Sequence, residues 1–138
     1  MIFETIAQLK LATLTAGQLV STKGYYASGD EGAADYIVAA TQAVDGYGDH
    51  VLAGSTVALL QAEGVTYLKQ YGAVADGAVN DQSAVQAALN KTGVIDGEDY
   101  SYRIDSTLVL NNDTTVRNAV IDFSNSTSAD IYRRTGGR

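Results

Sequence analysis

The sequence predicts a mainly β protein with short helices, organised as a small α+β unit followed by a longer series of short strands. Apolar residues recur with helical spacing in only two short segments, near residues 4–13 and 82–90. Between them, short runs rich in β-branched and aromatic residues alternate with turns made of Gly, Asn and Asp. After residue 90, apolar residues alternate with polar ones without an intervening helical segment, a pattern typical of a β-solenoid or a β-sandwich.

The composition excludes several classes of protein. The 138 residues are 46% hydrophobic and 18% charged, which is typical of a globular chain rather than a disordered one. Cysteine is absent, so a disulfide framework, a thiolate nucleophile and a cysteine metal site are impossible. A protein with a net charge of −7 and no basic stripe is expected to bind nucleic acid poorly. No apolar run reaches the ~18 residues that a membrane-spanning helix needs.

Residues 1–64 are predicted to hold one helix and about four short strands. Ile2, Ile6 and Leu9 recur at helical spacing, and Thr5 is placed to cap the start of the helix. The turn clusters between the expected strands are short, which favours a small antiparallel α+β unit. The strands are expected where Val, Ile, Leu and Tyr gather, in residues 18–26 and 35–40 and in one or two segments of 51–61.

The middle of the chain predicts a strand, a turn and a short amphipathic helix in direct succession. Residues 65–74 have the alternation of a strand, and Asp76-Gly77 is a strong turn dipeptide. Asn80 or Asp81 is placed to cap the helix by accepting a hydrogen bond from an otherwise unpaired backbone N–H. We therefore interpret Asp76 and Asp81 as turn and cap residues rather than catalytic acids. The helix is too short to be stable alone, so it must pack on an apolar surface through Val85, Ala88 and Leu89.

Residues 91–138 are predicted to form strands of about four to six residues broken by polar turns. Alternate residues are apolar, and these are expected to point inward. The expected inward residues are Tyr100, Tyr102, Ile104, Leu108, Leu110, Ile121 and Phe123.

The segment YGAVADGAVNDQSAVQAAL, residues 71–89, resembles the opening motif of the pectate-lyase-like right-handed β-helix. In that family a strand leads to a Gly-Ala pair, an Asp-Gly turn, an acidic pair with a hydroxyl residue and a helix that contains Ala, an aliphatic residue and Gln. The sequence departs from the family at Asn80, where Asp is frequent, and at Gln82-Ser83, where Asp/Thr-Ala is frequent. The matching residues are Gly72-Ala73, Asp76-Gly77, Asn80-Asp81, Ser83 and Val85-Gln86.

Residues 3–38 resemble the N-terminal module that precedes the β-helix in bacteriophage tailspikes. A short helix, a strand that ends in Gly24-Tyr25 and a Gly-Asp-rich turn before a Tyr strand come in that order. Together the resemblances imply a virion-proximal adaptor module over residues 1–64. They imply the first strand, capping helix and first coils of a right-handed parallel β-helix over residues 65–138.

The resemblance also implies partners and a location. It predicts a homotrimer in the phage tail that is made in the host cytoplasm and docks to a tail, baseplate or adaptor protein. Contact with bacterial surface polysaccharide would come through a further, C-terminal part of a longer chain. No nucleic-acid or membrane partner is expected.

In a parallel β-helix the short helix would have a clear physical role. The first coil of such a fold exposes an apolar end, and exposed strand edges invite pairing with other chains. Solenoids therefore need atypical end caps. We predict that residues 67–90 are this cap and that residues 91–138 are the first coils.

Candidate catalytic residues are few. His50 is the only histidine, and its position between Asp49 and Val51 favours a solvated turn histidine over a catalytic triad or a zinc site. Glycosidases use two carboxyl groups roughly 5–9.5 Å apart. Glu98 and Asp99 would point to opposite faces of an extended strand, and spacing alone pairs none of the other acids. The carboxylate candidates are Glu98, Asp99, Asp105, Asp122 and Asp130.

Other patterns favour structure over chemistry. The acidic segment 29–35 lacks the ligand spacing of an EF-hand and is interpreted as a turn. The basic segment 132–138 could touch an acidic glycan, but a solvated surface is the preferred interpretation. Tyr100 and Tyr102 have strand spacing, so core packing is preferred over glycan stacking. No catalytic, cofactor-binding or metal-binding residue is assigned.

Three functions are compatible with these patterns. The favoured one is the virion-attachment and trimerising N-terminal part of a phage tailspike, a host receptor-binding protein, without enzymatic activity in this segment. The alternatives are a polysaccharide depolymerase (glycosidase or lyase) that acts on capsule or O-antigen, and a glycan-binding module. The first is preferred because the recognisable features concern folding and capping rather than catalysis.

Overall fold

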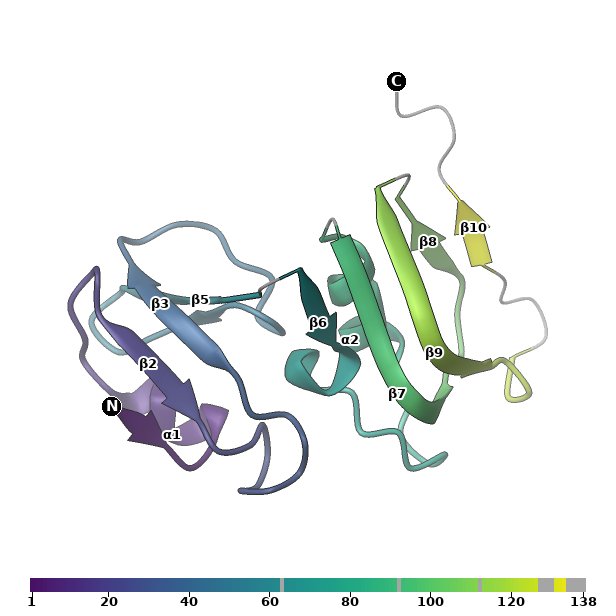
Figure 1. The fold of residues 1–138 in the computed structure, drawn as a ribbon, viewed down its shortest axis with the longest axis horizontal. Coiled ribbons are helices and arrows are strands. Elements are labelled where there is room, and N and C mark those ends of the chain that lie inside the picture. The colour runs from purple at the N-terminus through teal and green to yellow at the C-terminus, as the bar shows by residue number, and fades with distance from the viewer. Residues whose placement is uncertain (63, 92, 112, 127–130, 134–138) are drawn as a thin grey trace. The chain divides into compact units, whose positions relative to one another are not determined.

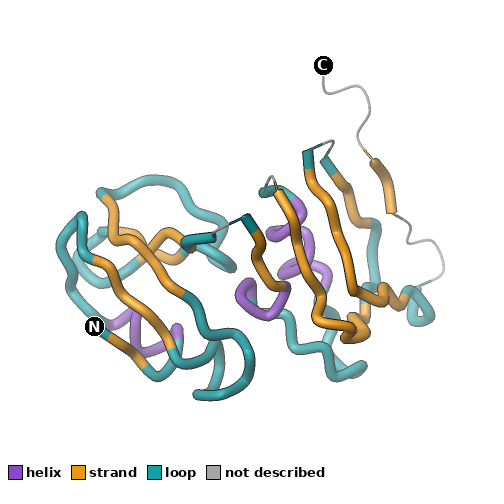
Figure 2. Tube along the Cα trace, viewed as in Figure 1, coloured by secondary structure: helices purple, strands orange, loops and turns teal. Residues whose placement is uncertain are grey.

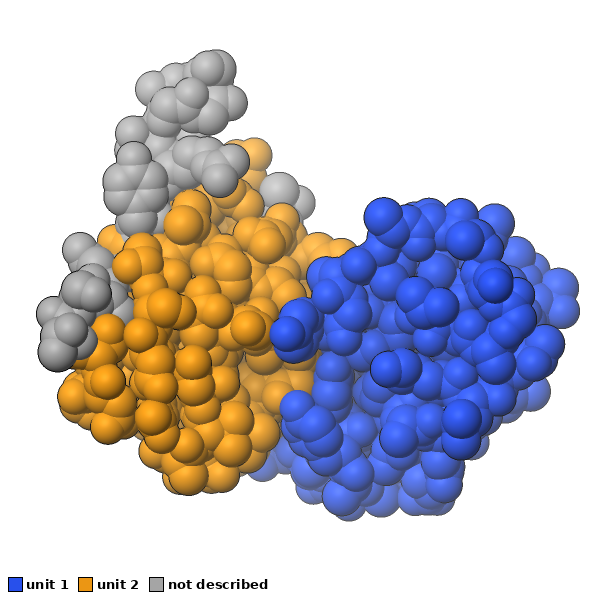
Figure 3. Space-filling view, turned by 180° about the vertical axis from the view of Figure 1, so that it is seen from behind, with its two compact units in different colours: residues 1–63 blue, residues 64–138 orange. Residues whose placement is uncertain are grey.

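The computed structural model describes the whole chain except residues 63, 92, 112, 127–130 and 134–138. It divides into two compact units, residues 1–63 and 64–138, shown in different colours in Figure 3. Strands dominate both units among the described residues, and the helices are short (Figures 1 and 2).

The first unit is a five-stranded sheet with helix α1 (Ile6–Leu11) packed on one face. The strand order is β1-β2-β3-β5-β4, in which β1 pairs parallel with β2 and all other pairs are antiparallel. The predicted wholly antiparallel arrangement is wrong at β1, because β1, α1 and β2 form a strand–helix–strand crossover that returns the chain in the same direction. The strands are β1 (Ile2–Phe3), β2 (Leu19–Thr22), β3 (Asp35–Ala39), β4 (His50–Val51) and β5 (Val57–Leu60).

The core of the first unit lies between α1 and the sheet. Ile6 and Leu9 of the helix are buried against the inward residues of the central strands, which include Val20, Tyr36 and Val38. Ile2 does not continue the helical stripe as predicted, because it lies in β1. The helix begins as predicted, since the Thr5 side chain accepts a hydrogen bond from the backbone N–H of Gln8 at 3.3 Å.

A tight loop follows β2, which ends at Thr22 rather than extending to residue 26. The Asp30 carboxylate organises this loop by accepting hydrogen bonds of 2.8–3.0 Å from four backbone N–H groups. Gly24 is required there, because a Cβ atom would lie 1.8 Å from the carbonyl oxygen of Ala27. The predicted turn within residues 29–35 is therefore built around a satisfied carboxylate.

The second unit contains two parallel sheets and helix α2 (Gln82–Leu89), which lie side by side in Figure 1. In the first sheet Val94 pairs with Val65 on one side and with Thr115 on the other, so successive coils are in parallel register. The step from Val94 to Thr115 is about 20 residues, the length of a short solenoid repeat. The first sheet consists of β6 (Val65–Tyr67), β7 (Gly93–Arg103) and β9 (Thr114–Asp122), and the second of β8 (Leu108–Leu110) and β10 (Ile131–Arg133).

Three strands of the second unit differ in length from the prediction. The expected strand over residues 65–74 ends at Tyr67, because the chain then coils into a 3₁₀-helix (Leu68–Tyr71) that buries both of its end residues. Strands β7 and β9 have 11 and 9 residues instead of four to six. The pairing register of β7 and β9 shifts between Asp96 and Tyr100, and residues with positive φ interrupt the extended backbone at Glu98, Asp99 and Asn118.

The predicted inward pattern after residue 90 holds for part of the set. Tyr102, Ile104 and Leu108 are 0–1% exposed, which confirms their core positions. Tyr100 is only half-buried, and the ammonium group of Lys69 lies over its ring, 3.8 Å from the ring centroid. The remaining predicted core residues are half-buried, namely Leu110, Ile121 and Phe123.

Candidate functional site

The candidate site is the capping helix α2 and the contacts that hold it on the coil. Val85, Ala88 and Leu89 are 0–3% exposed, so the predicted packing face is confirmed. Part of this face borders a hollow of the coil interior in which every lining side chain is aliphatic. The hollow is lined by Val85, Leu89, Leu108, Leu110, Val116, Ile121 and Ile131. The helix therefore shields apolar coil interior that would otherwise face water.

Asp81 fastens the loop before α2 rather than capping the helix. Its carboxylate is buried and accepts hydrogen bonds of 2.9 Å from the backbone N–H groups of Val74 and Ala75. Its own N–H donates to the carbonyl oxygen of Arg103 at 2.8 Å. The predicted side-chain cap by Asp81 is wrong, because this side chain points back across the loop. Asn80 instead supplies the oxygen for the helix start, accepting from the N–H of Gln82 at 3.1 Å.

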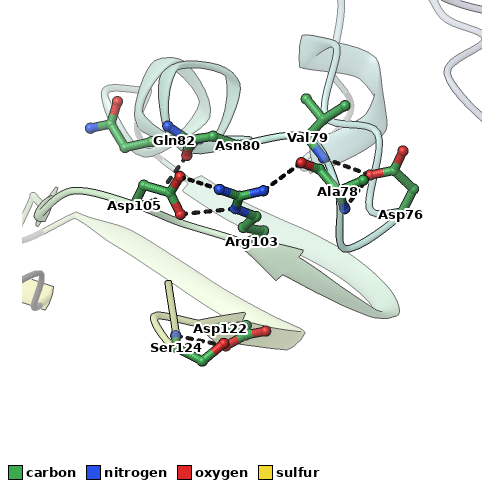
Figure 4. A network of polar contacts seen from close by, with 9 residues as sticks. All are labelled: Asp76, Ala78, Val79, Asn80, Gln82, Arg103, Asp105, Asp122 and Ser124. Atoms are coloured by element: carbon green, nitrogen blue, oxygen red, sulfur yellow. Dashed lines mark hydrogen bonds and ion pairs between the residues drawn. The ribbon is translucent and has the colours of Figure 1, made fainter. Parts of the chain in front are cut away.

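Arg103, the last residue of β7, joins the same loop to the segment that directly follows β7 (Figure 4). Its guanidinium group forms a two-pronged ion pair with Asp105, at 3.0 Å from Nε and 2.9 Å from Nη2, and Nη1 donates to the carbonyl oxygen of Ala78 at 2.6 Å. Asn80 Oδ1 also accepts from the backbone N–H of Asp105 at 3.1 Å. These contacts of Arg103 and Asn80 fix the loop that leads into α2.

Asp76 forms the predicted turn at the tip of this loop, as Figure 4 shows. Its Oδ1 accepts hydrogen bonds of 2.9 Å from the N–H groups of Ala78 and Val79. These hydrogen bonds lower the pKa of the Asp76 carboxyl. The assignment of Asp76 to a structural turn is confirmed.

A second charged contact joins two successive coils. Asp96 of β7 accepts from Nε of Arg117 at 2.9 Å and from Nδ2 of Asn118 at 3.2 Å, and Arg117 is its direct register partner in β9. The backbone N–H of Glu98, at 2.7 Å, is the main cause of the lowered pKa of Asp96, which its burial partly offsets. Sequence reasoning missed this pair, although Asp96 and Arg117 lie about one solenoid repeat apart.

Two of the candidate carboxylates, Asp105 and Asp122, have structural contacts. Glu98 and Asp99 have φ values of 56° and 66°, so the backbone is not extended there and the alternation of faces considered for an extended strand does not apply. Asp105 is engaged by Arg103, and Asp122 accepts from the N–H of Ser124 at 2.8 Å. Asp130 lies outside the described residues, as does most of the basic segment 132–138.

The electrostatics of Asp76, Asp96 and Asp122 disfavour general acid catalysis by these three groups. A glycosidase acid needs a raised pKa so that it still carries a proton near neutral pH. The hydrogen bonds from Ser124 lower the pKa of Asp122, and the pKa values of Asp76 and Asp96 are lowered as well. All three groups are therefore carboxylates at neutral pH.

His50 is buried rather than solvated, so the predicted turn position is wrong. It lies in edge strand β4 opposite Ala58, on the face of the sheet that packs on α1, and it is 2% exposed. Its ring centroid lies 5.7 Å from that of Tyr25 and 6.1 Å from that of Tyr36. Neither ring nitrogen has a hydrogen-bond partner among the described residues, and burial lowers the pKa of His50 to about 4. This environment has no nucleophile–base–acid arrangement.

Metal-binding clusters and membrane-spanning helices are both absent from the described part of the chain. It contains no group of three or more His, Cys, Asp or Glu side chains placed to hold a metal ion. It also contains no helix that is long and apolar enough to cross a membrane.

Replacing Asp81 with asparagine is expected to lower the free energy of unfolding of the second unit by about 2 kcal/mol. An amide keeps only one acceptor oxygen, so one of the N–H groups of Val74 and Ala75 would face an NH₂ donor. Urea unfolding followed through the amide signal of Ile95 measures the loss. The exposed Asp113, replaced in the same way, is the matched control with the same change in charge. Equal stability of the two variants would contradict the role of Asp81.

The parallel ladder β6-β7-β9 covered by α2 defines the class of fold: a small α+β unit followed by the helix-capped start of a parallel β-helix. No family model and no curated protein sequence matches the chain. Solved structures do share the fold, and they confirm the predicted fold class.

Three of these structures illustrate the likeness. The tailspike gp49 of Acinetobacter baumannii bacteriophage Fri1, a capsular polysaccharide depolymerase, matches with a TM-score of 0.62 and 21% identity over 83% of this chain and 22% of its own. The enzymatically active domain of bacteriophage CBA120 tailspike protein 2 matches with a TM-score of 0.65 and 12% identity over 99% of this chain and 27% of its own. Pantoea stewartii WceF, a glycan biofilm modifying enzyme with a bacteriophage tailspike-like parallel β-helix fold, matches with a TM-score of 0.61 and 12% identity over 94% of this chain and 27% of its own. The chain thus spans roughly a quarter of each.

Proposed function

We propose that the chain is the N-terminal part of a bacteriophage tailspike, in which residues 1–64 attach the protein to the virion and residues 65–138 begin the β-helix. The supporting observation is the α2-capped parallel ladder, which occurs in a chain that resembles phage tailspikes over most of its length. A structural role is favoured over catalysis, because Asp76 and Asp81 accept hydrogen bonds from backbone N–H groups and Asp96 and Asp105 pair with arginines.

The proposed protein is a homotrimer. Light scattering on the 138-residue chain is expected to give three times the mass of one chain, independent of concentration in the micromolar range. A monomer under these conditions would contradict trimerisation by this segment. The measurement does not depend on which virion protein the chain docks to.

The proposed location is the phage tail, after synthesis in the host cytoplasm, with a tail, baseplate or adaptor protein as the docking partner. Antibodies raised against residues 1–62 are expected to label the tails of intact virions at the tail-proximal ends of the spikes. Labelling restricted to the distal tips of the spikes would contradict the assignment of the first unit to attachment.

A second proposal concerns the longer protein, as a depolymerase of bacterial surface polysaccharide. It is supported by the descriptions of gp49 as a capsular polysaccharide depolymerase and of WceF as a glycan biofilm modifying enzyme. The 138-residue chain is expected to leave a panel of capsular and O-antigen glycans intact, whereas the longer protein cleaves one of them. Cleavage by the 138 residues alone would instead favour an active site within this segment.

A further inference from the structure

The polar side of α2 meets the backbone of β8 through the carboxamide of Gln86. Gln86 Nε2 donates to the carbonyl oxygen of Val109 at 2.9 Å, and Gln86 Oε1 accepts from the N–H of Val109 at 2.8 Å. One side chain thus satisfies both polar groups of one strand residue. A carboxamide can do this because it carries a donor and an acceptor side by side, as a peptide unit does.

Two neighbouring contacts extend this row along β8. Gln82 Nε2 donates to the carbonyl oxygen of Thr107 at 3.2 Å, and Asn111 Nδ2 donates to the carbonyl oxygen of Leu89 at 3.2 Å. The backbone groups that α2 contacts belong to Thr107, just before β8, and Val109, two residues apart, which is the spacing at which a strand presents backbone groups to one edge; Asn111, just after β8, contributes its side chain instead. Two strand residues rise by about 6.6 Å and four helix residues by about 6 Å, so the two repeats match over this length.

A hydrogen bond within α2 also orients the side chain of Gln86. Gln86 Nε2 also donates to Oδ1 of Asn90, one turn further along α2, at 3.0 Å. Gln82, Gln86 and Asn90 therefore lie along one side of the helix at intervals of four residues. The apolar side, with Val85 and Leu89, packs into the coil.

The order of elements explains why β8 needs such a partner. Strand β7 has β6 before it in its sheet, but the second sheet contains only β8 and β10 among the described residues. Between β6 and β7 the chain forms α2 instead of a strand. The helix therefore occupies the place in the chain where the first coil would have supplied a neighbour for β8.

We propose that the Gln82–Gln86 row of α2 is a substitute strand, which completes the hydrogen bonding of β8 and prevents this edge from pairing with a strand of a second copy of the chain. A helix with only an apolar contact face would cover the coil but would leave the N–H and C=O of Val109 available to another strand. The carboxamide of Gln86 supplies a donor and an acceptor at the point where the edge of β8 presents the C=O and N–H of Val109. This role does not depend on the proposed tailspike function.

Replacing Gln86 with methionine tests the proposal, because methionine keeps the length and helix propensity of glutamine but removes both hydrogen bonds. Sedimentation velocity is expected to show assemblies larger than those of the unaltered chain, growing with concentration. Amide exchange at Val109 is expected to become at least about tenfold faster, which corresponds to the loss of about 1.4 kcal/mol. Gln82→Met, which removes one longer hydrogen bond, is expected to give a smaller effect in both measurements.

Ser83→Met is the matched control, because it adds the same side chain to an exposed position of the same helix. It is expected to leave both the size distribution and the exchange of Val109 unchanged. Self-association of this control to the same extent as Gln86→Met would overturn the proposal, as would a Gln86→Met protein that keeps the size distribution and the Val109 protection of the unaltered chain. If Gln86→Met does not fold, the unaltered chain still decides: exchange of its Val109 amide at the rate of an unstructured peptide would overturn the proposal.

Discussion

Replacing Gly97 with alanine is expected to lower the free energy of unfolding of the second unit by roughly 3 kcal/mol or more. A Cβ atom at this position would lie 2.5 Å from Cβ of Ala119, 2.8 Å from its Cα and 2.8 Å from the carbonyl oxygen of Asn118. Two of these atoms belong to the backbone of the next coil, so no side-chain rotation can relieve the contact. The two coils would have to separate at a point where their strands are joined in a parallel ladder.

Urea unfolding, followed through the amide signals of Ile95 in the second unit and Val38 in the first, measures the effect separately in each unit. Only the Ile95 transition is expected to move. Gly77→Ala is the matched control, because its Cβ would meet open space and its positive φ of 77° would cost only about 1–2 kcal/mol. Adding Ala119→Gly is expected to restore part of the loss, since it removes the shortest contact and leaves the other two. A Gly97→Ala protein as stable as the unaltered chain would show that the coils are not this close.

Lowering the pH from 7 to 5 is expected to reduce the free energy of unfolding of the first unit by about 2 kcal/mol, approaching about 3 kcal/mol below pH 4. Burial lowers the pKa of His50 to about 4, and the charge of Lys10 acts in the same direction, whereas Asp45 and Asp49 oppose the shift. Between pH 6.5 and 4 the unfolded chain binds a proton that the folded unit does not. Stability is therefore highest above pH 6.5 and falls as the pH falls through this window.

The experiment compares the unaltered chain with His50→Phe, which keeps an aromatic ring between Tyr25 and Tyr36 but does not titrate. Urea unfolding of the first unit, followed through the Val38 amide at pH 7, 6 and 5, is expected to show the loss only in the unaltered chain. Carboxyls with lowered pKa, such as Asp30, lose their stabilising contribution at lower pH, as the pH falls through their folded-state values. An equal slope in both proteins between pH 7 and 5 would exclude His50 as the cause.

The elements that the sequence predicted well are those whose signal is local. The alternation in β3, the Thr5 cap of α1 and the Asp76 turn depend on residues a few positions apart, and the structure contains all three. The apolar face of α2 also followed from spacing alone, since a helix this short must bury it. The resemblance of residues 71–89 to the opening motif of a parallel β-helix then indicated that α2 would cover the first coil of such a fold.

The sequence was misleading where long-range contacts outweigh local preference. His50 is flanked by a turn-like segment, but pairing with β5 places it on the inner face of the sheet. Asp81 has the sequence position of a helix cap, yet the N–H groups of Val74 and Ala75 lie within its reach across the folded loop. The regular alternation expected of a strand breaks within β7, where Glu98 and Asp99 have positive φ and the pairing register shifts.

By itself, therefore, the sequence determined where the two α-helices, the Asp76 turn and most of the strands lie, though not where each strand ends, and that a short helix must cover an apolar surface. Only the tertiary structure decided which groups meet across the coil: Asp96 with Arg117, Gln86 with Val109, and Gly97 against Ala119. The physical reason is that periodicity reports the face on which a residue lies, whereas the register between coils depends on the length and bends of the segments that connect them.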